Sequence, residues 1–119
     1  MVEILKNRTK GVAKMVWQNC QKTGNEFYDY KRQLIRCSSS VGANYRADCR
    51  AKSDRDFLNK LKIVEEELDE TMFFIELITD LKLELKGLWD KSYDEASQLL
   101  KIKLKSIGTV RTKINRNKK

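Results

Sequence analysis

Apolar residues recur at three- and four-residue steps along most of the chain, which is the spacing of one face of an α-helix. This pattern predicts four amphipathic helices over about residues 2–22, 26–51, 53–86 and 92–116. In the first of them, lysines spaced by four residues line the opposite face. The positions expected to face the core are Val2, Leu5, Thr9, Val12, Val16 and Cys20, then Phe27, Tyr30, Leu34, Cys37, Val41 and Tyr45, then Phe57, Leu61, Val64, Leu68, Met72, Ile75 and Ile78, and finally Ala96, Leu100, Leu104, Ile107, Val110 and Ile114.

Short polar segments separate these stretches. Residues 23–25 supply a glycine to end one helix and an asparagine to begin the next. Ser53 is placed to cap the third helix, because two aspartates follow it in the first turn. Residues 86–91 are expected to form the third connection, and residues 92–95 match the S-x-x-E capping box. Four helices with short connections predict a single all-α domain over residues 1–119, folded as an antiparallel up-down-up-down four-helix bundle.

The predicted second helix contains a cluster of small residues. Serine and glycine inside a helix cost up to about 1 kcal/mol each relative to alanine, so their clustering indicates close approach by a neighbouring helix. The alternative is a kink or break near residues 38–42. The residues assigned to this helix-packing motif are Ser40, Gly42, Ala43 and Asn44.

The composition argues against catalysis. The 119 residues contain no histidine, which removes the side chain most used for acid–base chemistry near neutral pH and the commonest metal ligand. The serines of the small-residue cluster have no partner to activate them. The acidic run at residues 65–70 is expected to be a solvated face, with Glu67 or Glu70 able to anchor a basic residue of a neighbouring helix. We therefore predict no catalytic residue, no metal site and no cofactor.

The chain also lacks the marks of a secreted or membrane protein. Its first residues contain no continuous apolar segment of the kind found in signal peptides, and the longest apolar run, Met72–Ile75, is far too short to span a bilayer. The cysteines Cys20, Cys37 and Cys49 form no CxxC pair and are interpreted as reduced, apolar fillers. These features predict a cytoplasmic protein with no membrane contact.

Charge is distributed in blocks around a net value of +8. Residues 1–64 hold 14 Lys and Arg against 6 Asp and Glu, residues 65–95 hold 3 against 11, and residues 96–119 hold 8 against none. The acidic third helix and the basic fourth helix are expected to pack side by side and to pair along their facing flanks. A positive excess remains after every acid is counted, and this favours a polyanionic partner.

Basic residues gather around the junction of the second and third helices and along the fourth, which includes Lys103, Lys118 and Lys119. They are predicted to contact the phosphate backbone of RNA. Trp17 and Trp89 are interpreted as core or interface anchors in preference to base-stacking platforms. The predicted nucleic-acid-binding residues are Arg32, Arg36, Arg46, Arg50, Lys52, Arg55, Lys101, Lys105, Arg111 and Lys113.

Residues 33–76 carry a resemblance to a known family. The shared residues are Gln33-Leu34, Arg36, Ser40-Val41, Gly42 to Ala47, Ala51-Lys52-Ser53, Phe57, Lys60-Leu61, Val64 to Glu67 and Asp69-Glu70-Thr71. In these residues the chain resembles the bacterial four-helix bundle proteins encoded in intervening sequences of large-subunit ribosomal RNA genes. It differs from many members in having Ala43 in place of a proline, and Phe73-Phe74 where a tryptophan-containing pair is common.

The resemblance implies a homo-oligomer, in particular a pentameric ring, and a setting that involves ribosomal RNA. It also points to accessory proteins of diversity-generating retroelements, which engage nucleic acid and a reverse transcriptase. Asn44 would then organise helix contacts, and a direct RNA contact is the less favoured role. The resulting hypothesis is a non-enzymatic RNA-binding oligomer. The alternatives are a protein–protein adaptor, such as a reverse-transcriptase partner, and a self-assembling scaffold with no nucleic-acid role.

Overall fold

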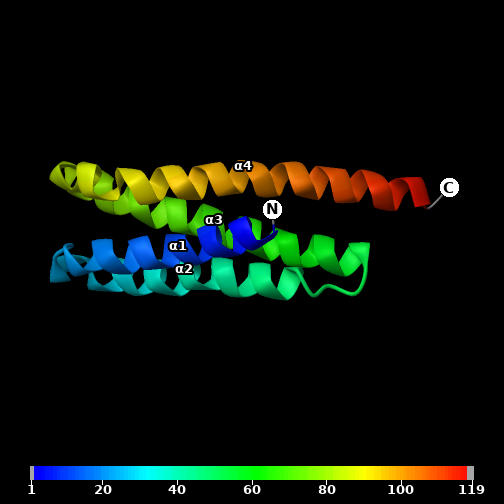
Figure 1. Ribbon diagram of the computed structural model, residues 1–119. Coiled ribbons are helices and arrows are strands. Elements are labelled where there is room, and N and C mark those ends of the chain that lie inside the picture. The colour runs from blue at the N-terminus through cyan, green and yellow to red at the C-terminus, as the bar shows by residue number, and fades with distance from the viewer. Residues whose placement is uncertain (1, 118–119) are drawn as a thin grey trace.

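The computed structural model describes residues 2–117, which form four α-helices joined by short connections (Figure 1). One-turn 3₁₀ helices, Asn25–Phe27 and Leu83–Leu85, precede the second and fourth. The described range contains no β-strand, so the predicted all-helical, four-helix fold is confirmed. The helices are α1 (Val2–Gln21), α2 (Tyr28–Asp48), α3 (Asp54–Leu81) and α4 (Lys86–Asn117).

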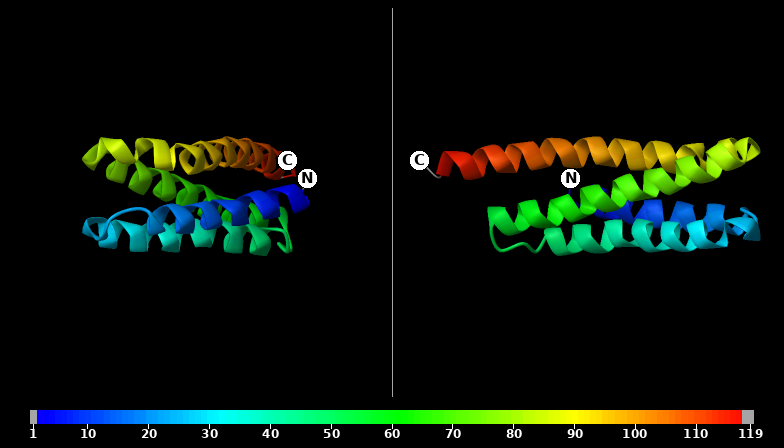
Figure 2. Two further views of the ribbon diagram at one scale, coloured as in Figure 1. Left: turned by 60° about the vertical axis from the view of Figure 1, so that its left-hand side comes forward. Right: turned by 180° about the vertical axis from the view of Figure 1, so that it is seen from behind.

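The helices lie in an elongated bundle with principal extents of 54 × 23 × 22 Å. The chain doubles back at each connection, so that each helix runs alongside the one before it in the opposite direction (Figures 1 and 2). The α2–α3, α3–α4 and α1–α2 contacts are extensive, whereas α1 and α4 touch less. The 32-residue α4 extends beyond α1 and α2, so its final turns pack on the beginning of α3 (Figure 1).

The core is a narrow apolar seam that follows the predicted stripes for most of its length. In α1 and α2 the buried positions match the prediction closely, although Val2 is 49% exposed and Tyr30 is only partly buried. A second, smaller cluster of Leu58, Leu61 and Ile107 holds the extended end of α4 on α3. Each amphipathic helix therefore buries one face, as its periodicity predicts.

In α3 and α4 the buried face is shifted from the predicted one at several turns. Leu58 and Thr71 take core positions in α3, while Phe57 and Met72 are only partly buried. Thr71 tolerates burial because its hydroxyl donates to the Glu67 carbonyl oxygen at 2.8 Å and to Cys37 Sγ at 3.3 Å. Apolar periodicity overlooks such a residue, because the internal hydrogen bonds that satisfy it are a product of the fold.

In α4, two of the leucines predicted to face the core do not occupy it. Leu99 and Lys103 are buried where Leu100 and Leu104 were expected, and Leu104 is 47% exposed. The prediction failed here because it assigned every lysine to the surface. Lys103 is 2% exposed, with its Nζ 3.5 Å from the centroid of the Tyr45 ring.

The third connection was also misplaced. The chain reverses at residues 82–85 and α4 begins at Lys86, so Ser92 lies inside the helix and does not cap it. Ser92 is buried, accepts a hydrogen bond from Asn19 Nδ2 at 3.1 Å and donates to the Trp89 carbonyl oxygen. Trp89 is also buried, with its Nε1 donating to Thr23 Oγ1 at 3.1 Å. These contacts with α1 and its C-terminal turn give the extra helical turns a buried face.

The small-residue cluster lies in one continuous helix, so the alternative of a break at residues 38–42 is wrong. A Cβ built on Gly42 would lie 3.4 Å from the backbone nitrogen of Lys10, which shows how closely the α1 backbone approaches this position. Asn44 has a more local role than expected. Its Nδ2 donates to the carbonyl oxygen of Ser40 at 2.9 Å and to the Ser40 hydroxyl at 2.7 Å, both within α2.

The cysteines are unpaired, but only two are buried. Cys20 and Cys37 lie in the core, and burial raises the pKa of Cys20 to about 11 and that of Cys37 above its usual value. Cys49, at the C-terminal end of α2, is exposed, so its interpretation as an apolar filler is wrong. Within residues 2–117, no helix is both long and apolar enough to cross a membrane.

Candidate nucleic-acid interface

A shallow groove of about 480 Å³ runs between α1 and α2 and is edged with basic side chains. Its lining combines three cations with small residues. The lining residues are Lys10, Ala13, Ser39, Gly42, Ala43, Arg46 and Arg50.

The helical repeat explains why these residues share one surface. On α2, Gly42, Ala43 and Arg46 fall at steps of three, four and seven residues from Ser39, and side chains at such steps lie on one face of a helix. Arg50 lies in the turn that follows α2. Gly42 and Ala43 form the floor because they carry almost no side chain, and the longer side chains of Arg46 and Arg50 stand at the edge. The packing motif and the basic residues predicted from the sequence therefore belong to the same surface.

The cations of this groove have no acidic partner. No carboxylate is among the residues that line it. Among the described residues, Lys10, Arg46 and Arg50 take part in no ion pair, whereas other basic residues do. The ion pairs are Lys6–Glu3, Arg8–Glu95, Arg36–Glu67, Arg36–Glu70, Lys60–Asp56, Lys82–Glu26 and Lys113–Asp54.

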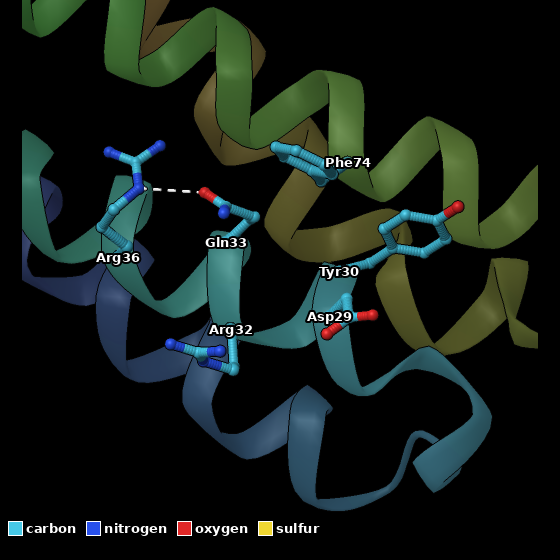
Figure 3. A pocket seen from close by; sticks show the side chains of 6 residues that line it. All are labelled: Asp29, Tyr30, Arg32, Gln33, Arg36 and Phe74. Atoms are coloured by element: carbon cyan, nitrogen blue, oxygen red, sulfur yellow. Dashed lines mark hydrogen bonds between the residues drawn. The ribbon is translucent and has the colours of Figure 1, made fainter.

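Two of the predicted residues, Arg32 and Arg36, lie on a different surface. They line a groove of about 500 Å³ with Asp29, Tyr30, Gln33 and Phe74 of α3 (Figure 3). Arg36 Nε donates a hydrogen bond to Gln33 Oε1 at 3.0 Å, and the guanidinium forms ion pairs with Glu67, at 3.3 Å, and with Glu70.

This outcome matches the expectation that an acidic residue of the third helix would anchor a neighbouring cation. The pairing with Glu70 raises the pKa of Arg36. An arginine already bound to two carboxylates offers little to a phosphate, so we do not place this groove in the interface.

The remaining predicted residues are spread over the α2–α3 connection, the start of α3 and the length of α4. Lys52, Arg55, Lys101 and Arg111 are exposed and line neither groove. Lys105 and Lys113 share a separate shallow surface on α4 with Arg116, and Lys113 pairs with Asp54 at 3.3 Å. The final lysines, Lys118 and Lys119, lie outside the described residues.

Lys103 belongs to a buried polar cluster near the C-terminal end of α2. Burial lowers the pKa of its ammonium group to about 8, although the nearby Asp48 favours the charged form. Asp48 is 1% exposed and both of its carboxylate oxygens lack a hydrogen-bond partner. Burial raises the pKa of Asp48 to about 6, with Lys103 and Lys60 acting against the shift and Asp56 adding to it.

The acidic block of α3 does not neutralise α4 in the way that the sequence suggested. The only ion pair between these helices in the described range is Lys113–Asp54. The antiparallel arrangement places the acidic second half of α3 beside the start of α4, which is itself acidic at Asp90, Asp94 and Glu95. The basic part of α4 consequently lies at the opposite end of the molecule.

Lys10 was missed as a candidate site residue. Its signal was present in the row of lysines at positions 6, 10 and 14, but nothing in the sequence shows which residues of α2 this row will meet. The structure places Lys10 beside Gly42. No cluster of potential metal ligands occurs in the part of the chain that the structure describes.

Comparison with known proteins agrees with this architecture. A protein of unknown function from the S23 ribosomal protein family of Bacteroides thetaiotaomicron VPI-5482 has a similar crystal structure, with a TM-score of 0.74 and 25% sequence identity, over 87% of this chain and 97% of that one. A search of curated proteins finds no match. The family model for the 23S rRNA-intervening sequence protein matches residues 4–112, which include the whole α1–α2 groove. The chain therefore belongs to the 23S rRNA-intervening sequence protein family.

Proposed function

We propose that this protein is a non-enzymatic RNA-binding protein that holds a phosphate backbone in the α1–α2 groove. The observation that carries the proposal is the set of three cations, Lys10, Arg46 and Arg50, with no carboxylate beside them. Their small-residue floor leaves room for a backbone to lie close to the helices. Family membership favours ribosomal RNA or its intervening sequence as the target.

The groove suits phosphate contacts more than base reading. Lysine and arginine at its edge can neutralise successive phosphates. Among the other lining residues, only Ser39 carries a polar side-chain group that could bind a base. Such contacts supply affinity with little dependence on base sequence. Three contacts to single-stranded RNA give an expected slope of about −2 for log K against log salt concentration.

The proposal is tested by removing the three charges together. The variant Lys10→Gln/Arg46→Gln/Arg50→Gln should bind RNA much more weakly than wild type at low salt, and its salt slope on single-stranded RNA should be shallower by about 2. Fluorescence anisotropy over a salt series measures both quantities. The matched control is Lys22→Gln/Lys86→Gln/Lys91→Gln, which removes the same charge from exposed residues at the opposite end of the bundle. Equal losses in the two variants, or binding unaffected by salt, would reject the proposed site.

A homo-oligomer, in particular a homopentamer, is part of the same proposal. It is supported by large apolar side chains left exposed on the single chain, including Ile4 at 58% and Phe73 at 56%. Surfaces of this kind are commonly covered in assemblies. Light scattering measures the mass of the particle directly, and a monomer at micromolar concentration would contradict the assembly.

Partner binding is a second candidate function, in which the chain acts as an adaptor for another protein such as a reverse transcriptase. The specific observation is the exposed Phe73, whose ring packs edge-on against Phe74. Phe74 in turn lines the groove of Arg32 and Arg36 (Figure 3). Phe73→Ser should abolish partner capture while leaving RNA affinity intact. Partner capture that survives Phe73→Ser, together with a loss of RNA affinity, would exclude this role for the α2–α3 surface.

A further inference from the structure

The two tryptophans of this chain have opposite environments. Trp89 is completely buried and its indole nitrogen is bound to Thr23. Trp17 is 56% exposed, although it lies on α1 between the buried residues Val16 and Cys20. An exposed tryptophan presents a large apolar surface to water, and this cost suggests a binding role for its free face.

Trp17 lies at the end of the basic groove. It lines a small, largely apolar hollow of about 300 Å³ together with Lys10, Ala13, Lys14 and Gln18, all from one face of α1. Lys10 and Ala13 also line the α1–α2 groove, so the two hollows adjoin at these residues. No carboxylate lines either of them.

The order of these residues forms a track. Trp17 and Lys10 are separated by about 10 Å along α1, at 1.5 Å per residue. Lys10 lies beside Gly42, and from there α2 continues past Arg46 to its end at Asp48, about 9 Å further in the same direction, because the two helices are antiparallel. Arg50 follows in the turn after α2. At about 3.4 Å per nucleotide the whole track accommodates roughly six nucleotides of a stacked strand.

We propose that Trp17 is a stacking platform for an unpaired base, and that the ligand of the groove is single-stranded RNA. The inference rests on the proposed function and specifies its ligand. Sites for single strands combine a positively charged groove with aromatic side chains on which bases stack. A paired base is unavailable to Trp17, because both of its faces are covered within the duplex.

The surroundings of Trp17 favour a nucleic acid over a second copy of the chain. Lysine is depleted at the centre of protein interfaces, yet Lys10 and Lys14 flank this indole. Both lysines precede Trp17 on the same face of α1, where they are available to the phosphates on that side of a stacked base. A single-stranded occupant satisfies both the apolar and the cationic parts of the surface.

The test compares single-stranded and duplex RNA. Trp17→Ala should weaken binding of a twelve-nucleotide oligoadenylate by about five- to hundredfold while changing the affinity for a twelve-base-pair RNA duplex less than twofold. Trp17→Phe should recover part of the loss, since phenylalanine retains an aromatic face. Oligoadenylate should also quench the fluorescence of wild type, and Trp17→Phe, which retains Trp89, gives the background.

The outcomes separate this inference from the proposed function. If the triple charge variant loses both ligands but Trp17→Ala loses neither, the stacking role is wrong and the phosphate groove stands. If the charge variant binds both RNAs like wild type, the proposed function itself fails. Equal loss of the two RNAs in Trp17→Ala, or a change in particle mass by light scattering, would overturn the inference and assign Trp17 to a structural or subunit contact.

Discussion

At the scale of single residues, two buried ionisable groups, Asp48 and Lys103, have pKa values shifted far from their usual ones. Asp48 and Lys103 are held out of water at the C-terminal end of α2, where the carboxylate has no hydrogen-bond partner and the ammonium group rests on the ring of Tyr45. Both pKa shifts have burial as their main cause, and burial opposes the charged form of each group. The cluster therefore carries a cost at neutral pH, which its neighbours only partly offset.

The pH dependence of stability follows from the direction of these shifts. The pKa of Asp48 rises from 3.8 in the unfolded chain to about 6, so its favourable contribution is complete below pH 3.8 and is lost as pH rises through 6. The pKa of Lys103 falls from 10.5 to about 8, so its contribution grows as pH rises from 8 to 10.5. This cluster should thus stabilise the fold least between pH 6 and 8.

Urea denaturation of wild type and Asp48→Asn at a series of pH values checks the acidic limb. The free energy of unfolding of wild type minus that of the variant should fall as pH rises from 4 to 6. Over this interval residue 48 of the unfolded wild type has lost its proton while the folded protein still holds it, and asparagine does not titrate. Asp29→Asn, at an exposed carboxylate of the same helix, is the control. A difference that stays flat or rises over this interval would contradict the burial of Asp48.

At the scale of the helices, Gly42 decides how closely α1 and α2 approach. A Cβ at this position would touch the backbone of Thr9 and Lys10 at 3.4–3.5 Å, which is ordinary van der Waals contact. The site therefore has room for a methyl group. The small-residue cluster sets the depth of the basic groove, so packing and binding are linked through one position.

Two substitutions at Gly42 should have opposite effects on stability. Gly42→Ala should raise the free energy of unfolding by about 0.5–1 kcal/mol, because alanine favours the helix and fits the space. Gly42→Leu should lower it by about 1–3 kcal/mol, because the side chain must push α1 away. Gly11→Ala, where nothing lies within 4 Å, controls for helix propensity alone. Thermal and urea denaturation measure all three, and a Leu variant as stable as wild type would disprove the close approach.

Helix periodicity predicts the existence and order of the four elements because an amphipathic helix must bury one face. It places their ends less well. Residues 86–91 read as a connection, yet Trp89 and Leu88 find apolar neighbours and the helix begins at Lys86. The apparent capping box at Ser92 was misleading, because a serine can also satisfy its hydroxyl inside a helix by bonding to the preceding turn.

At the scale of the whole molecule, the bundle is unequal along its length. Four helices pack at the end that contains the α1–α2 connection, whereas the final turns of α4 are held mainly by Leu58 and Leu61 of α3 through Ile107 (Figure 2). Fewer buried contacts mean a lower free energy of local opening. The exposed cations of the final turns, Arg111, Lys113 and Arg116, are therefore expected to lie in the least stable part of the fold.

Hydrogen–deuterium exchange should show this inequality directly. Amides of residues 108–117 are expected to exchange much faster than those of residues 89–103, which lie in the same helix but in the full bundle. Ile107→Ala should extend the fast-exchanging region toward residue 103, whereas Leu104→Ala, at an exposed position, should not. Uniform protection along α4 would show that the extended end is covered, for example by a second copy of the chain.

The sequence by itself determined that the protein is helical, that it has four helices in this order, and which family it resembles, because periodicity and family motifs are properties of neighbouring residues. It also identified the excess of positive charge. Only the tertiary structure decided which charges remain available. It paired Arg36 with Glu67 and Glu70, buried Lys103, and brought Lys10 of α1 into one groove with Arg46 of α2 and with Arg50 in the turn that follows. The reason is that the electrostatic surroundings of a cation depend on distances between helices, and those distances are fixed by side-chain packing across the bundle.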